Sequence, residues 1–202
     1  MLAIAHGCRS GQIPADVAVV IADTPQAGGI ERARALGLAT GVVDRRRYVH
    51  NGRPDRAAFE AALASAIADC GADYLILAGF MRVLSAEFVT RHAGRMLNIH
   101  PSLLPRHKGL DTHARALAAG DTEHGASVHF VTAELDGGPL IAQAVVPVLP
   151  GDDIAALSGR VHAVEHKLYP MVIEWLTGGR LDWNGGRPTL DGAPLNSPAR
   201  VQ

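Results

Sequence analysis

Three short apolar runs, each followed by turn-forming residues, predict buried β-strands. They are residues 17–22, 73–79 and 95–100. Continuous apolar runs are typical of strands that are covered on both faces of a parallel sheet. Helical patterns at residues 29–36 and 55–69 lie between these runs. The alternation of strands and helices therefore predicts an α/β fold with a mostly parallel sheet.

The pattern changes after Gly125. Residues 126–132 alternate between apolar and polar side chains, and residues 140–148 form a second apolar run beyond a glycine-rich loop. Two strands joined in this way are typical of an antiparallel pair. Residues 152–176 have the pattern of a long amphipathic helix, which a pair of glycines ends. We therefore expect a C-terminal antiparallel part beside the parallel sheet.

Length and composition indicate one folded domain. The chain has 202 residues, of which 48% are hydrophobic and 19% charged, so it can bury a sizeable core. The C-terminal segment is rich in glycine, proline, asparagine and arginine. We therefore expect a domain over residues 1–190 and a flexible tail over residues 191–202.

Charge and cysteine content limit the classes of partner. The formal net charge is −1, which gives no electrostatic reason to expect nucleic acid or a membrane surface. No apolar run is as long as a membrane span, and the N-terminus has no signal-peptide pattern. Cys8 and Cys70 do not make a disulfide framework, and the histidines lack zinc-site spacing. We expect a cytoplasmic protein, monomer or homodimer, that binds small molecules and no metal.

The run NIHPSLLP at residues 98–105 is the first candidate for catalysis. Asn98 and His100 are two apart on a predicted strand and so point to the same side. An amide donor beside an imidazole suits a carbonyl oxygen that becomes negative during reaction. The same residues would also fit a satisfied core histidine beside a turn-capping asparagine.

Asp136, in the run LDGGP, is the second candidate. A carboxylate close to His100 would favour the charged imidazolium. Aspartate in a glycine-rich loop is, however, more often a simple turn residue. The two candidates gain meaning only if the fold brings them together.

Two further segments could bind substrate. The run AGFMRVL at residues 78–84 offers an apolar wall and, in Arg82, a cation for a carboxylate. Glu165 on the long helix could bind an amine if it is partly buried, and would otherwise be a solvated surface residue. We interpret residues 45–47, all arginine, as a solvated corner, and His107, His113 and His124 as surface residues.

Together these segments resemble the phosphoribosylglycinamide formyltransferase family, the folate-dependent enzymes of purine biosynthesis. The resemblance covers roughly residues 12–190 and rests on AGFMRVLS, NIHPSLLP, HGASVHFVTAELDGGPLIAQ, GLDTHARAL and the EHKLYP run that begins at Glu165. It implies a Rossmann-like formyltransferase fold and 10-formyltetrahydrofolate as co-substrate. It also implies that glycinamide ribonucleotide accepts the formyl group.

The resemblance also implies a role for each candidate. Asn98 would bind the formyl oxygen, His100 would be the general acid, and Asp136 would raise the pKa of His100 and organise a water. Glu165 would hold the amino group of glycinamide ribonucleotide. The folate would be bound by Arg56, Met81, Arg82, Val83 and Leu84, together with Asn98.

One departure from the family concerns the first strand. The family begins with a buried strand and a phosphate-binding loop, whereas this sequence begins with residues that resemble the first helix. Either the start has been assigned too late or the chain is truncated. We expect the 202-residue form to be poorly stable and nearly inactive, and a form extended upstream by about 15 residues to be active.

Three other functions remain open. Water could replace the amine, which would make the protein a formyltetrahydrofolate hydrolase. A different amine, such as a sugar amine, could accept the formyl group. Without the phosphate loop, the chain could also be an inactive folate-binding remnant.

Overall fold

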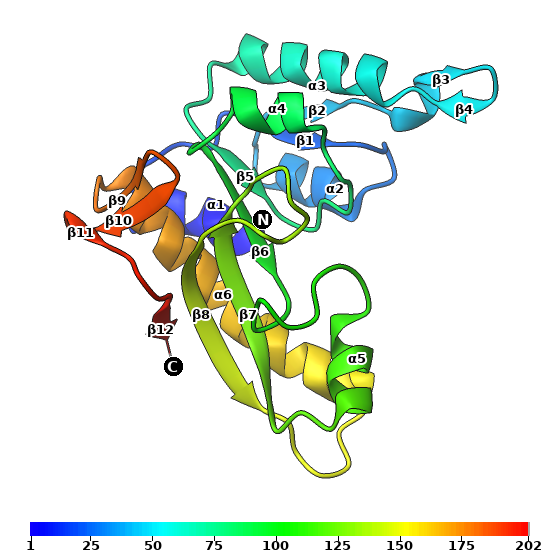
Figure 1. The fold of residues 1–202 in the computed structure, drawn as a ribbon. Coiled ribbons are helices and arrows are strands. Elements are labelled where there is room, and N and C mark those ends of the chain that lie inside the picture. Colours follow the sequence, from blue (N-terminus) through cyan, green and yellow to red (C-terminus); the bar gives the residue numbers. More distant parts are fainter. Residues whose placement is uncertain (202) are drawn as a thin grey trace.

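A five-stranded mixed sheet forms the centre of the molecule in a computed structural model that describes residues 1–201 (Figure 1). Its strands lie in the order β12-β8-β7-β6-β5, where β5 pairs with β6 and β8 with β12 in parallel, and β7 is antiparallel to both β6 and β8. The strands are β5 (Leu75–Leu77), β6 (Met96–His100), β7 (Glu123–Phe130), β8 (Leu140–Pro147) and β12 (Ala199–Val201). The expected parallel sheet with an antiparallel part is confirmed.

Strands β1 (Val20–Ala22) and β2 (Thr40–Val42) form a separate parallel pair. Within residues 1–201, β1 pairs only with β2, and β5 pairs only with β6. A cleft of about 820 Å³ is lined by both β1 and β5, with apolar side chains such as Ile21 and Leu63. The cleft therefore lies between the β1–β2 pair and β5, the edge strand of the central sheet.

Six α-helices are present in the described residues: α1 (Leu2–Arg9), α2 (Gly28–Ala35), α3 (Arg56–Cys70), α4 (Ala86–Arg91), α5 (Thr112–Ala119) and α6 (Ile154–Thr177). Side-chain caps begin three of them, because Asp55, Ser85 and Asp153 each accept a hydrogen bond from a backbone N–H of the first turn. The long helix α6 lies across β7 and β8 (Figure 1) and ends at Gly178. Its predicted position is confirmed to within two residues.

The residues after α6 form four strands that the sequence analysis does not predict. Strands β9 (Leu181–Asn184), β10 (Arg187–Leu190) and β11 (Ala193–Pro194) form a small antiparallel sheet. Where a flexible tail is expected, β12 adds to the edge of the central sheet by pairing with β8. The expectation missed this strand because its residues lack an apolar run, whereas the exposed edge of β8 supplies backbone partners. Gln202 lies outside the described residues.

Smaller elements lie between β2 and α3. They are the 3-10 turn η1 (Arg45–Arg47) and the hairpin strands β3 (Val49–His50) and β4 (Arg53–Pro54). The hairpin extends from the body of the molecule beside the start of α3 (Figure 1). Arg45, Arg46 and Arg47 are all exposed, as predicted for a basic corner.

The core has two parts. The larger cluster packs α6 against the central sheet through residues such as Phe130, Ile141 and Leu168, and the smaller one joins α3 to α4 through Leu63 and Phe88. Tyr169 on α6 links the helix to the sheet, because its buried hydroxyl lies 2.7 Å from the Leu77 carbonyl and 3.0 Å from the Leu97 carbonyl. These contacts hold β6, which carries two candidate residues, against α6.

No helix within residues 1–201 is long and apolar enough to cross a membrane. Within the same residues, no three histidine, cysteine, aspartate or glutamate side chains are grouped so that they could hold a metal ion.

Candidate active site

Strand β6 places Asn98 and His100 side by side at its carboxyl end. In the ladder with β7, Asn98 lies opposite His129, and His100 lies opposite Ser127. Pro101 follows at once, and its fixed φ and missing N–H end the strand there. The two side chains therefore project from a rigid strand end, the usual place for ligand sites in open α/β sheets.

The loop between β7 and β8 brings Asp136 to the same place. Asp136 has a φ of 46°, a left-handed conformation that aspartate tolerates better than most residues. Gly138 lies two residues later, and a Cβ there would overlap the Phe130 carbonyl, so the loop can turn this closely over β7 only at a glycine. The Gly109 N–H donates to Asp136 Oδ2 over 2.8 Å and holds the carboxylate in place.

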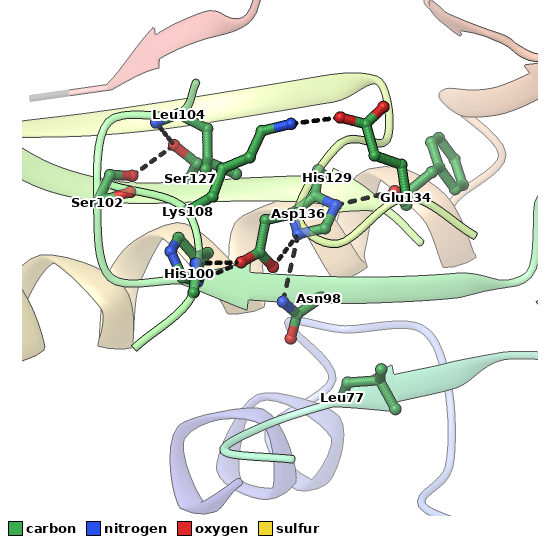
Figure 2. A network of polar contacts seen from close by, with 12 residues as sticks. Leu77, Asn98, His100, Ser102, Leu104, Lys108, Ser127, His129, Glu134 and Asp136 are labelled. Atoms are coloured by element: carbon green, nitrogen blue, oxygen red, sulfur yellow. Dashed lines mark hydrogen bonds and ion pairs between the residues drawn. The ribbon is translucent and has the colours of Figure 1, made fainter. Parts of the chain in front are cut away.

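His100 and Asp136 form a pair that is largely withdrawn from solvent (Figure 2). Nδ1 of His100 lies 3.5 Å from Asp136 Oδ2, and both side chains are 9% exposed. Nε2 of His100 lies 3.0 Å from the His107 carbonyl, and His107 is itself held by Asp121 at 2.7 Å. Both ring nitrogens therefore face oxygen acceptors, so each is placed to donate a hydrogen bond when it carries a proton. The structure thus joins two candidates whose meeting the sequence alone does not show.

A buried polar network fixes the segment that follows His100. The Ser127 hydroxyl accepts from the Leu104 N–H at 3.0 Å and from Gln143 Nε2 at 2.9 Å, and it donates to the Ser102 carbonyl at 2.6 Å. Gln143 also donates to the Leu104 carbonyl at 2.8 Å. These partners on β7 and β8 hold the loop after β6 rigidly, which preorganises the site.

His129 is a site residue that the sequence reasoning missed. It lies on β7 opposite Asn98, and its Nε2 is 3.2 Å from Asn98 Nδ2 and 3.7 Å from Asp136 Oδ1. The alternating pattern of residues 126–132 was a usable signal, because it places residues 127 and 129 on one face of the strand next to β6. His129 therefore joins Asn98, His100 and Asp136 in one cluster (Figure 2).

The expected folate-binding residues lie in two short segments. Met81 and Val83 are 70% and 56% exposed, so their side chains are free to form an apolar wall. Leu84 is 8% exposed and packs in the smaller core cluster. Each of the two expected arginines forms an ion pair with an acidic side chain. Arg82 Nε lies 3.0 Å from Asp23 Oδ2, and Arg56 Nε lies 4.0 Å from Glu60 Oε1.

Glu165 is partly buried on α6 rather than solvated. Its side chain is 14% exposed, and its carboxylate lies 3.5 Å from Nε2 of His162 on the same helix. Burial raises the pKa of the Glu165 carboxyl above its ordinary value, although His162 opposes this shift. A positively charged amine next to this carboxylate would relieve the cost of burying it.

The histidines near α5 are less exposed than the sequence suggests. His124 is predicted to lie at the surface but is 1% exposed, which corrects that prediction. It lies on β7, an inner strand of the sheet, and its Nε2 is 3.1 Å from Nδ1 of His113 on α5. Burial, reinforced by the neighbouring His113, lowers the pKa of His124 to about 4.

We expect the protein to lose stability as the pH falls from about 6.5 to about 4, because unfolded histidine titrates near 6.5 and folded His124 near 4. Between these values the unfolded chain binds a proton that the folded chain does not, so protons favour unfolding. The expected loss at pH 5 is about 2 kcal/mol relative to pH 7, measured as a lower Tm. A His124→Gln variant should show a smaller drop in Tm; an equal drop would contradict the assignment.

The sequence matches known proteins over most of its length. Residues 1–173 match the family model described as formyl transferase. The chain is 46% identical over 193 residues to the phosphoribosylglycinamide formyltransferase of Escherichia coli (strain K12), and the match covers 96% of this chain and 89% of that protein. The corresponding protein of Haemophilus influenzae is 41% identical over 192 residues, which are 95% of this chain and 88% of that protein.

Solved structures agree with the sequence matches. The phosphoribosylglycinamide formyltransferase of Coxiella burnetii superposes with a TM-score of 0.91 at 42% identity, covering 100% of this chain and 93% of that one. Glycinamide ribonucleotide transformylase 1 of Symbiobacterium toebii gives a TM-score of 0.87 at 46% identity, covering 93% and 86%. At these identities and coverages, the chain belongs to the formyl transferase family and, within it, to the phosphoribosylglycinamide formyltransferases.

Proposed function

We propose that this enzyme transfers the formyl group of 10-formyltetrahydrofolate to the primary amine of glycinamide ribonucleotide, as a step of purine biosynthesis. The observation that carries the proposal is the cluster of Asn98, His100 and Asp136, in which a carboxamide lies beside an imidazole paired with a carboxylate at 3.5 Å. The names of the relatives in Escherichia coli and Coxiella burnetii support the same activity.

The cluster suits attack of an amine on a formyl carbon. As the new C–N bond forms, the formyl oxygen becomes negative, and an N–H of Asn98 with the His100 imidazolium would stabilise it. A single donor of this kind typically contributes about 100- to 1,000-fold in rate. Asn98 and His100 stand on one strand end, so they need no rearrangement to act together.

Proton transfer completes the reaction. The attacking amine must lose a proton, and N10 of the folate must gain one as its bond to the formyl carbon breaks. The Nε2 proton of His100 is engaged by the His107 carbonyl at 3.0 Å, whereas its Nδ1 proton faces Asp136 over a longer 3.5 Å. We assign the general-acid step to the Nδ1 proton, with Asp136 stabilising the imidazolium and organising a water that carries the proton of the amine.

The substrate-binding part of the proposal uses the remaining candidates. The exposed Met81 and Val83 would cover the folate rings, and the packing of Leu84 in the core would hold their backbone in place. Arg56 and Arg82 would bind the folate carboxylates, since a guanidinium pairs with a carboxylate in two-point fashion. Glu165, partly buried on α6, would hold the amino group of glycinamide ribonucleotide.

The test compares 10-formyltetrahydrofolate turnover with and without glycinamide ribonucleotide, followed by the change in folate absorbance. Turnover that depends on the amine supports the proposal. Turnover at the same rate without the amine would indicate a hydrolase, and folate binding without turnover would indicate an inactive binding protein; either result would overturn it. Glucosamine-type sugar amines in place of the ribonucleotide test the remaining alternative acceptor.

A further inference from the structure

His129 is a buried imidazole beside the reacting groups with no role in the mechanism above. It is 2% exposed and stands on β7 directly opposite Asn98 of β6. The pairing of β7 with β8 shifts register between Val128 and His129, and such irregularities often redirect a side chain next to a site. A polar ring in this position needs a partner for each of its nitrogens.

The hydrogen bonds of His129 select one tautomer. Nδ1 lies 2.9 Å from the Phe130 carbonyl, which can only accept, so Nδ1 carries the proton. A neutral ring with its proton on Nδ1 has a lone pair on Nε2. That lone pair faces Asn98 Nδ2 at 3.2 Å (Figure 2).

This tautomer determines how the Asn98 carboxamide is turned. If the amide were reversed, its oxygen would face the Nε2 lone pair, and two acceptors would meet without a proton between them. With the NH₂ group toward His129, one N–H donates to Nε2 and the second remains free. We propose that His129 is a positioning residue, a hydrogen-bond acceptor that holds the Asn98 carboxamide with its free N–H available to the formyl oxygen.

The charges around His129 are consistent with a neutral acceptor. Burial lowers the pKa of the His129 imidazole, and the nearby His100 and Lys108 add to that shift, while the Phe130 carbonyl and Asp136 oppose it. Asp136 Oδ1 is 3.7 Å from Nε2, beyond a hydrogen bond, so the ring is not committed to the carboxylate. A charged ring would donate from Nε2 and would turn the amide oxygen toward itself.

This inference rests on the proposed function only for the identity of the oxygen that Asn98 contacts. The experiment compares His129→Leu, which removes the acceptor, with His129→Gln, whose side-chain oxygen can replace Nε2. His92→Leu is the matched control, because His92 is 9% exposed with no hydrogen-bond partner for its Nε2 within the described residues and lies outside the site. Each variant is also made in an Asn98→Ala background.

We expect His129→Leu to lower kcat about 10- to 100-fold with less than about 3-fold change in KM for the folate, because misplacing a reacting group by an ångström has effects of this size. His129→Gln should recover part of that loss, and His92→Leu should retain wild-type kcat. In the Asn98→Ala background, His129→Leu should change kcat less than about 2-fold, since the group that it orients is absent. An equal loss of kcat in both backgrounds would overturn the positioning role.

A second measurement does not depend on activity. Long-range ¹H–¹⁵N spectra of histidine-labelled protein at pH 7 should show the proton of His129 on Nδ1, and the Nε2 resonance should shift in Asn98→Ala. A proton on Nε2, or a doubly protonated ring, would overturn the inference even if turnover behaves as expected. If His129→Leu does not fold, the kcat of His129→Gln and the spectra of the wild-type protein decide whether His129 is the acceptor that orients Asn98. Absence of amine-dependent turnover in the wild-type protein would instead reject the proposed function and leave the spectra to decide the orientation of Asn98.

Discussion

His100→Ala is expected to lower kcat about 100- to 10,000-fold, the range that general acids contribute. The substitution removes the imidazole that lies 3.5 Å from Asp136 and projects from the same strand end as Asn98. Folate affinity should change little, because all of the proposed folate residues except Asn98 lie on other segments, and Asn98 is kept. Single-turnover and steady-state kinetics with saturating substrates measure the effect, and equilibrium titration of the folate measures binding.

Two further variants make this result interpretable. His100→Gln can still donate to the His107 carbonyl, which Nε2 of His100 contacts at 3.0 Å, but it has no proton of suitable acidity to transfer. It should therefore be nearly as inactive as His100→Ala while keeping a Tm close to that of the wild type. His50→Ala, an exposed histidine on the β3–β4 hairpin, should retain full activity. Wild-type rates in His100→Gln would remove His100 from the catalytic role.

Asp136→Asn is expected to lower kcat by at least about 100-fold. The new side chain has nearly the same shape, its oxygen can still accept from the Gly109 N–H, and asparagine tolerates the left-handed φ of 46° at this position. The substitution therefore removes the negative charge and little else. His100 then has no counter-charge for its imidazolium, and the water that takes the proton of the amine has no acceptor.

The free energy of unfolding separates the loss of charge from damage to the fold. Asp136→Asn should change it by less than about 1 kcal/mol, because the carboxamide keeps the shape of the carboxylate and can still accept from the Gly109 N–H. Asp69→Asn, at an exposed position near the end of α3, is the control and should retain wild-type kcat. A small change in kcat for Asp136→Asn, with stability preserved, would show that the charge of Asp136 is not needed.

Much of the fold was predictable from local patterns. The apolar runs ending at His100 and at Val148, and the long pattern before Gly178, correspond to β6, β8 and α6. Such patterns are informative because burial on one or both faces dictates which positions must be apolar. The strands β9 to β12 were not predicted, since they are short and polar and are stabilised by pairing with neighbours that the sequence does not identify.

The candidate site residues also differ in how far the local sequence could predict their position and burial. Asn98 and His100 share a strand, so their common direction follows from the two-residue period of a β-strand. His124 was placed at the surface because a histidine has no strong burial preference, whereas its position on an inner strand leaves it 1% exposed. Glu165 could be read either way until α6 was seen to bury it partly.

The sequence by itself determined the class of fold, the strand that carries the amide and imidazole, and the residue types available for formyl transfer. It did so because hydrophobic periodicity and side-chain chemistry are local properties. Only the tertiary structure decided that Asp136 lies 3.5 Å from His100, and that His129 faces Asn98 at 3.2 Å. Those distances arise from the pairing of β6 with β7 and from a loop that folds back over them, and contacts between distant segments are set by packing rather than by any local pattern.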